Sequence, residues 1–203
     1  MKRSFSKIRA LLPPKLVTII DFEIGTYVSL WKCLAYRKTL KGKFLSKQAF
    51  RYDELQNGII WMVLFLSIGE IIAFELLVSN EKIKVILLVL GIWSALLILG
   101  IWAAVKANPH EVDSEFLYVR QGSLYEIPIP RNLIKEIMQI TARDQSKCKL
   151  IDQSLFLPVM NETNIRISLV SSMPCDLPWG MSGEVETIYF YLDKVNENFK
   201  YIK

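Results

Sequence analysis

The chain has 203 residues, of which 52% are hydrophobic and 22% are charged, and its formal net charge is +5. Its single histidine excludes a two-histidine metal site within one chain, and its three cysteines form no C-x-x-C pair. It contains no G-x-x-x-x-G-K, G-x-G-x-x-G or G-x-S-x-G motif, so we expect no catalytic residues, no metal and no cofactor. The expectation is therefore a protein that is not an enzyme, and an intramembrane enzyme is the third hypothesis.

Residues 1–57 are expected to form a cytoplasmic basic segment with an amphipathic helix at about 15–40. Pro13-Pro14 is a natural helix start. Apolar residues recur at helical spacing and basic residues gather toward one end, which is typical of helices lying in a membrane interface. The alternative is a helix that packs on the soluble domain with its charges solvated. The candidate lipid-interface residues are Arg37, Lys38, Lys41, Lys43, Lys47 and Arg51.

Residues 58–106 are expected to form a transmembrane helical hairpin. Its two apolar runs, at about 59–79 and 84–105, each match the roughly 20 residues that a helix needs to cross a bilayer. The link between them is too short for a folded domain, so both outer flanks lie on the same side of the membrane. Glycines expected to allow close helix approach are Gly69, Gly91 and Gly100.

The distribution of basic residues predicts the orientation. Residues 1–58 hold twelve Lys and Arg against four acids, a net of +8, whereas residues 106–203 hold eleven against thirteen, a net of −2. Basic residues favour the cytoplasmic side of membrane spans. We therefore expect a multi-pass protein of the plasma membrane with both termini in the cytoplasm. Because this topology already explains the positive charge, nucleic acid is not an expected partner.

Glu70 lies near the middle of the first span, where an ionised group costs a few kcal/mol. We therefore expect it to face the second span, another subunit or water, or to be protonated. One reading is a proton or ion relay or a polar subunit contact. The other is a protonated carboxyl group with a hydrogen bond inside the hairpin. Possible partners within the hairpin are Ser67, Trp93 and Ser94.

Glu75 is the second candidate polar site in the spans. It lies five residues beyond Glu70, about 7.5 Å along the helix and rotated away from it, so the two do not form a carboxylate pair. We expect Glu75 near the outer interface, neutralised by Lys82 or Lys84.

Residues 107–203 are expected to form a cytoplasmic β domain. Alternating apolar residues predict six or seven antiparallel strands in a small barrel or sandwich. Asp193 is expected to cap a terminal helix that covers one open end. His110 is interpreted as a polar linker residue, and residues 171–178 and 179–183 as loops at the barrel rim. The clearest strand segments are 115–120, 123–129, 133–140, 154–157, 164–170 and 187–192.

The predicted spans are followed by these patterns: Asp113-x-Glu115-x-Leu117-x-Val119-Arg120-x-Gly122, Ile127-Pro-Ile-Pro130, Ile134-x-x-Ile137, Asn164-Ile-Arg-Ile-Ser-Leu169 and Tyr189-Phe-Tyr-Leu-Asp193. This order resembles the bacterial pleckstrin-homology-like (PH-like) membrane proteins, in which a helical hairpin precedes a PH-like barrel. The resemblance covers roughly residues 45–200, and Glu70 and the segment Ala49–Tyr52 resemble an uncharacterised two-span subgroup. A His often stands in that subgroup near the position of Glu75, where this chain differs.

The resemblance implies an α+β membrane protein with a two-helix transmembrane hairpin, an antiparallel PH-like β-barrel or sandwich and a C-terminal helix. PH-like folds bind lipids, peptides or neighbouring proteins, and the fold alone does not choose among these. We therefore expect a membrane-anchored binding or scaffolding protein with membrane lipids, a membrane-protein partner or a homo-oligomer as partners. The alternative is a small accessory subunit of a transport or channel assembly, with Glu70 as the intramembrane relay.

Overall fold

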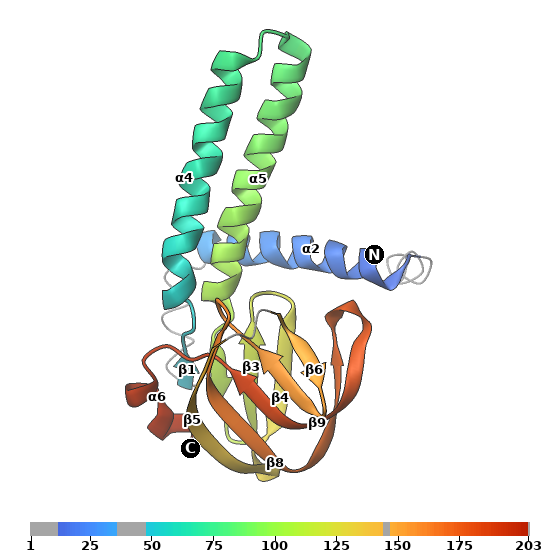
Figure 1. The fold of residues 1–203 in the computed structure, drawn as a ribbon, viewed down its shortest axis with the longest axis vertical. Coiled ribbons are helices and arrows are strands. Elements are labelled where there is room, and N and C mark those ends of the chain that lie inside the picture. The colour runs from blue at the N-terminus through green and yellow to red at the C-terminus, as the bar shows by residue number, and fades with distance from the viewer. Residues whose placement is uncertain (1–11, 36–47, 144–146, 203) are drawn as a thin grey trace.

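A computed structural model describes residues 12–35, 48–143 and 147–202 of the chain. It combines helices with two β-sheets (Figure 1). Two long helices rise side by side from the β domain, and a third helix crosses beside their lower part. We call the end where the chain enters and leaves this helical hairpin its base.

The hairpin consists of α4 (Glu54–Leu77) and α5 (Glu81–Ala107). Within the described residues these two helices are long and apolar enough to cross a membrane. Their most apolar stretches are only 11% and 6% buried, whereas the core helix of a soluble protein would be mostly buried. Asn80 caps α5 by accepting hydrogen bonds from the backbone N–H groups of Lys82 and Ile83. The two helices thus carry their apolar side chains on the outside.

Glycines have different roles in the hairpin. Gly91 allows close approach of α4, because a Cβ atom there would lie 2.6 Å from Cγ1 of Ile71. Gly69 faces open space, so its predicted role in helix approach is wrong. Gly100 meets Thr26 of the crossing helix instead of α4.

The crossing helix is α2 (Pro14–Ala35), which packs against α5 near the base (Figure 1). Thr26 and Ser29 are buried at this contact. The Cys33 thiol lies 3.7 Å from the carbonyl oxygen of Ala103 and donates a weak hydrogen bond to it. Small residues on both helices therefore let the backbones approach closely.

The first sheet has four strands in the order β1-β2-β3-β4, and all its pairs are antiparallel. Its edge strand β1 comes from the segment before the hairpin, and β2 follows directly after it. The strands are β1 (Gln48–Phe50), β2 (His110–Val112), β3 (Phe116–Gln121) and β4 (Tyr125–Pro130).

The second sheet has the order β5-β8-β9-β7-β6 and is antiparallel apart from the parallel pair β7 and β9. Short 3₁₀ turns, η1 (Arg131–Leu133) and η2 (Pro178–Gly180), precede β5 and β9. The chain ends in helix α6 (Val195–Ile202). The strands are β5 (Ile134–Arg143), β6 (Lys149–Ile151), β7 (Ser154–Leu157), β8 (Glu162–Leu177) and β9 (Met181–Phe190).

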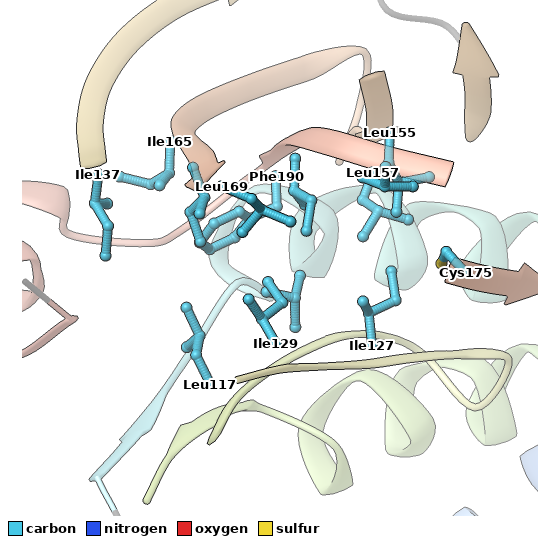
Figure 2. Packing of buried hydrophobic residues seen from close by; sticks show 14 of the residues in the cluster. Leu117, Ile127, Ile129, Ile137, Leu155, Leu157, Ile165, Leu169, Cys175 and Phe190 are labelled. Carbon is cyan, nitrogen blue, oxygen red and sulfur yellow. The ribbon is translucent and has the colours of Figure 1, made fainter. Parts of the chain in front are cut away.

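The core lies between the two sheets (Figure 2). Leu117, Ile127 and Ile129 of the first sheet point toward the side chains of the second sheet. Val195 and Phe199 of α6 pack against this core. The core residues of the second sheet shown in Figure 2 include Leu155, Leu157, Ile165 and Phe190.

The sheets do not close into a barrel, so the sandwich alternative describes the fold. The prediction that residues 171–178 and 179–183 form loops is also wrong, apart from the short turn η2. The second half of β8 pairs with the first half of β9, from Met173 opposite Val185 to Leu177 opposite Met181. Burial stops alternating at the irregularity between Ser168 and Met173 and resumes at Cys175, so that Cys175 and Leu177 are buried.

Candidate functional site

A cluster of buried polar groups joins the base of the hairpin to the β domain. Tyr52, directly before α4, is 1% exposed. Its hydroxyl donates to the carbonyl oxygen of Asn108 at 3.1 Å and accepts from the backbone N–H of Gly122 at 2.7 Å. Burial raises the pKa of Tyr52 well above its usual value, so the hydroxyl keeps its proton. One side chain therefore links the ends of both helices to the turn after β3.

His110 lies in β2 and is 2% exposed, so its predicted role as a polar linker residue is wrong. Its Nδ1 accepts from the backbone N–H of Arg120 at 3.1 Å, and its Nε2 donates to the carbonyl oxygen of Tyr191 at 2.9 Å. The rings of Tyr52 and Phe190 pack against it. Burial, helped by the positive charge of Arg120, lowers the pKa of His110 to about 4. The imidazole is therefore neutral and serves as a structural bridge between the two sheets.

Arg120 carries the positive charge beside this bridge. Its guanidinium lies 2.7 Å from Glu111 on β2 and 2.8 Å from Glu126 on β4. It also lies over the ring of Tyr118. Burial opposes the charged form, but the two carboxylates outweigh it and raise the pKa of Arg120. The two ion pairs tie three neighbouring strands together on one face of the first sheet.

Two aspartates hold the start of α4. The carboxylate of Asp53 accepts hydrogen bonds from Nε and Nη2 of Arg51, each at 2.6 Å. The carboxylate of Asp193 accepts a hydrogen bond from the backbone N–H of Glu54 at 2.9 Å, so Asp193 caps α4. The prediction that it caps the terminal helix is wrong. Burial raises the pKa of Asp193, whereas for Asp53 the bonds to Arg51 outweigh burial and lower the pKa.

Of the six basic residues predicted at the lipid interface, only Arg51 lies within the described residues. Its side chain is 68% exposed although it pairs with Asp53. A cleft of about 400 Å³ on one side of it is lined in part by Glu54, Asn57 and Lys194. A second cleft of about 340 Å³ is lined in part by Lys106 and Pro109. Arg37, Lys38, Lys41, Lys43 and Lys47 lie outside the described residues.

Helix α2 carries a stripe of exposed apolar side chains. At about 100° per residue they share one side of the helix. Thr18 and Gly25, which contact the β domain, and Thr26, which contacts α5, lie on the other side. Trp31 and Leu34 are each 70% exposed. We call this set the α2 stripe, and its members are Leu16, Ile20, Ile24, Val28, Trp31 and Leu34.

The two carboxylates predicted as polar sites on α4 have different surroundings. Glu70 is exposed on the outer surface of α4, and no hydrogen-bond or ion-pair partner meets it among the described residues. Glu75 lies 3.4 Å from the amine of Lys84, one of the two lysines expected to neutralise it. The structure thus leaves Glu70 without any of the partners considered for it within the hairpin.

The described residues include no group of three or more His, Cys, Asp or Glu placed to hold a metal ion. The buried groups at the junction instead bind one another and the backbone. Sequence reasoning missed Tyr52 and His110 as structural residues. The available signal was their position, since each stands within four residues of a long apolar helix and beside charged neighbours.

Comparisons of the chain with protein-family models, with curated proteins and with solved structures found no match.

Proposed function

We propose that the chain is a membrane-anchored binding or scaffolding protein. In this proposal α4 and α5 cross the plasma membrane, α2 lies in the inner headgroup region, and the β domain is held at the cytoplasmic surface. The observation that carries it is the α2 stripe, because six exposed apolar residues on one helix face need a nonpolar environment.

The depth at which α2 crosses the hairpin supports this placement. Its contact at Gly100 is seven residues before the end of α5, or about 10 Å from the base. The rings of Trp61 and Trp102 meet at the same end of the hairpin, and the amine of Lys106 lies 4.2 Å from the Trp102 ring centroid. Tryptophan and lysine are typical of the interface between hydrocarbon and headgroups. The stripe would therefore lie at the level where acyl chains begin.

The attachment of the β domain supports a scaffolding role. Its first sheet includes β1, which comes from the segment before α4. Hydrogen bonds of Tyr52 and Asp193 also join the base of the hairpin to the β domain. A domain held in this way would keep a fixed distance from the bilayer, which raises its effective concentration for membrane-bound partners. The PH-like assignment is part of this proposal: two packed sheets followed by a helix favour it, and the parallel pair β7 and β9 is a departure.

Quenching by lipids brominated on the acyl chains tests the position of α2. The unmodified protein in vesicles is compared with the variants Trp31→Phe and Trp179→Phe. Trp179 lies on η2, at the β-domain side of α2. We expect Trp31→Phe to remove a strongly quenched part of the emission and Trp179→Phe to remove an unquenched part. Equal quenching of the two residues would contradict the proposal.

A second candidate function is an accessory subunit of a transport or channel assembly. The exposure of Glu70 on α4 favours it, since an intramembrane carboxylate without a partner in its own chain is a functional signal. The test is Glu70→Gln. Loss of transport with unchanged protein level and membrane extraction would support a relay, and unchanged transport would exclude it.

A further inference from the structure

Glu70 and Ser94 lie on the same flank of the hairpin. Glu70 precedes Ile71 by one residue, and Ser94 follows Gly91 by three, where Ile71 and Gly91 meet at the α4–α5 contact. About the axis of α4, Glu70 is rotated by about −100° from Ile71, and about the axis of α5, Ser94 is rotated by about 300° from Gly91. Because the two helices run in opposite directions, these rotations bring both residues to the same side of the pair. Both are exposed. We call this side the Glu70 flank.

The two residues also lie at nearly the same height. Measured from the contact between Ile71 and Gly91, Glu70 is one residue and Ser94 three residues closer to the base, a difference of about 3 Å. Each side chain leans toward the start of its own helix. Glu70 therefore leans toward the base and Ser94 away from it, so that their polar atoms approach a common level.

We propose that two copies of the chain associate through this flank, with Glu70 of each copy hydrogen-bonded to Ser94 of the other. The inference rests on the proposed function, because it requires α4 and α5 to lie in a bilayer. Under a twofold axis along the membrane normal, a residue keeps its height and meets the opposite helix of the second copy. The flank carries both an acceptor and a hydroxyl donor at one height, so it is complementary to itself.

The rest of the fold leaves this flank open. Helix α2 packs on α5 at Gly100, which lies on the side of α5 turned away from α4 and closer to the base. Leu90 and Val63 on the same flank are exposed apolar residues that can surround the polar contact. Trp93, the other donor considered for Glu70, lies farther round α5. A second copy would give both the carboxylate and the hydroxyl a hydrogen-bond partner, whereas lipid acyl chains offer a partner to neither.

Crosslinking in membranes tests the arrangement. Glu70→Cys and Ser94→Cys are placed in two differently tagged copies, expressed together and treated with a short bifunctional thiol reagent. The control is Ile72→Cys with Ile92→Cys, which are exposed at similar heights on the opposite flank. Expression of each variant together with the unmodified chain measures the background of crosslinks formed through the three native cysteines. We expect at least fivefold more mixed dimer from the Glu70 and Ser94 pair.

Dilution into lipid tests the role of the two side chains. Energy transfer between labelled copies is measured over a range of protein-to-lipid ratios for the unmodified chain, Glu70→Leu, Ser94→Ala and the control Ile72→Ala. We expect Glu70→Leu and Ser94→Ala to need at least tenfold more protein per lipid to associate, with Ile72→Ala unchanged.

The outcomes separate this inference from the proposed function. A protein that resists alkaline extraction from membranes but stays monomeric, or that crosslinks equally through Ile72 and Ile92, overturns the dimer and leaves the membrane anchor intact. Unchanged association of Glu70→Leu also overturns it. A protein that is extracted as a soluble species contradicts the membrane anchor itself.

Discussion

The carboxylate of Asp193 accepts a hydrogen bond from the backbone N–H of Glu54 at 2.9 Å, although the two residues are 139 positions apart. Asp53, the residue at the usual capping position of α4, makes no side-chain bond to the helix. The cap of the first long helix is therefore supplied by the end of the β domain. Formation of the β domain and the start of α4 are coupled through this one carboxylate.

Replacement of Asp193 should weaken that coupling. We expect Asp193→Ala to lower the free energy of unfolding by about 1 kcal/mol, the usual value of a lost helix cap. Asp193→Asn keeps an acceptor oxygen and should lose less. Unfolding of the purified protein in a mild detergent, followed by tryptophan fluorescence, measures both. Equal stability of Asp193→Ala and the unmodified chain would show that the cap contributes nothing.

Tyr52→Phe removes the hydroxyl that joins Gly122 to Asn108. Because the N–H of Gly122 then loses its hydrogen bond in a buried site, we expect a loss of about 1–3 kcal/mol. Tyr189→Phe is the matched control, since Tyr189 stacks on Phe156 and its hydroxyl has no hydrogen bond among the described residues. The same unfolding measurement should leave this control within about 0.5 kcal/mol. A Tyr52→Phe protein as stable as the control would contradict the bridging role.

His110 should make stability depend on pH. Its pKa is lowered from 6.5 to about 4 in the folded protein, so between these values the unfolded chain binds more protons. Stability therefore rises with pH through this window and is lost on acidification, by at most about 3 kcal/mol. The midpoint of thermal unfolding between pH 4 and 7 measures the effect. We expect His110→Asn to flatten that part of the profile, and an equally steep profile would assign the titration to other groups.

Two glycine substitutions should differ in their effect on the packing of α2. A methyl group at Gly100 would collide with Thr26, so Gly100→Ala should separate α2 from α5 and expose α2 to protease. Gly69 faces open space, so Gly69→Ala should only gain helix propensity, up to about 1 kcal/mol. Limited proteolysis followed by mass spectrometry compares the rate of cleavage within residues 12–35. Equal rates for the two variants would contradict the packing of α2 on α5.

The parts of the fold that follow from local patterns could be predicted. The apolar runs of α4 and α5 are continuous, and the turn at Gln121-Gly122 marks the hairpin of β3 and β4 within one or two residues. Such signals depend on residues close together in the chain. The strands β1 and β2 have three residues each and pair across the whole hairpin, so no local pattern identifies them.

The candidate site was harder to predict for the same reason. The burial of His110 depends on Tyr191 and Phe190, some 80 positions later. The cap made by Asp193 depends on Glu54, whereas its local context predicted a cap for the next helix. Helical spacing pointed to four members of the α2 stripe, which are Leu16, Ile20, Trp31 and Leu34. The contact of Gly100 with Thr26 depends on where α2 crosses α5.

The pairing of β1 with β2 has a mechanical consequence. Phe50 is in register with His110, so the chain is held together by main-chain hydrogen bonds just before it enters the hairpin and just after it leaves. A sliding or twisting of α4 against α5 would have to shift this register or move the two strands as a unit. Because β2 continues into the rest of the first sheet, a displacement between the long helices would be passed directly to the β domain.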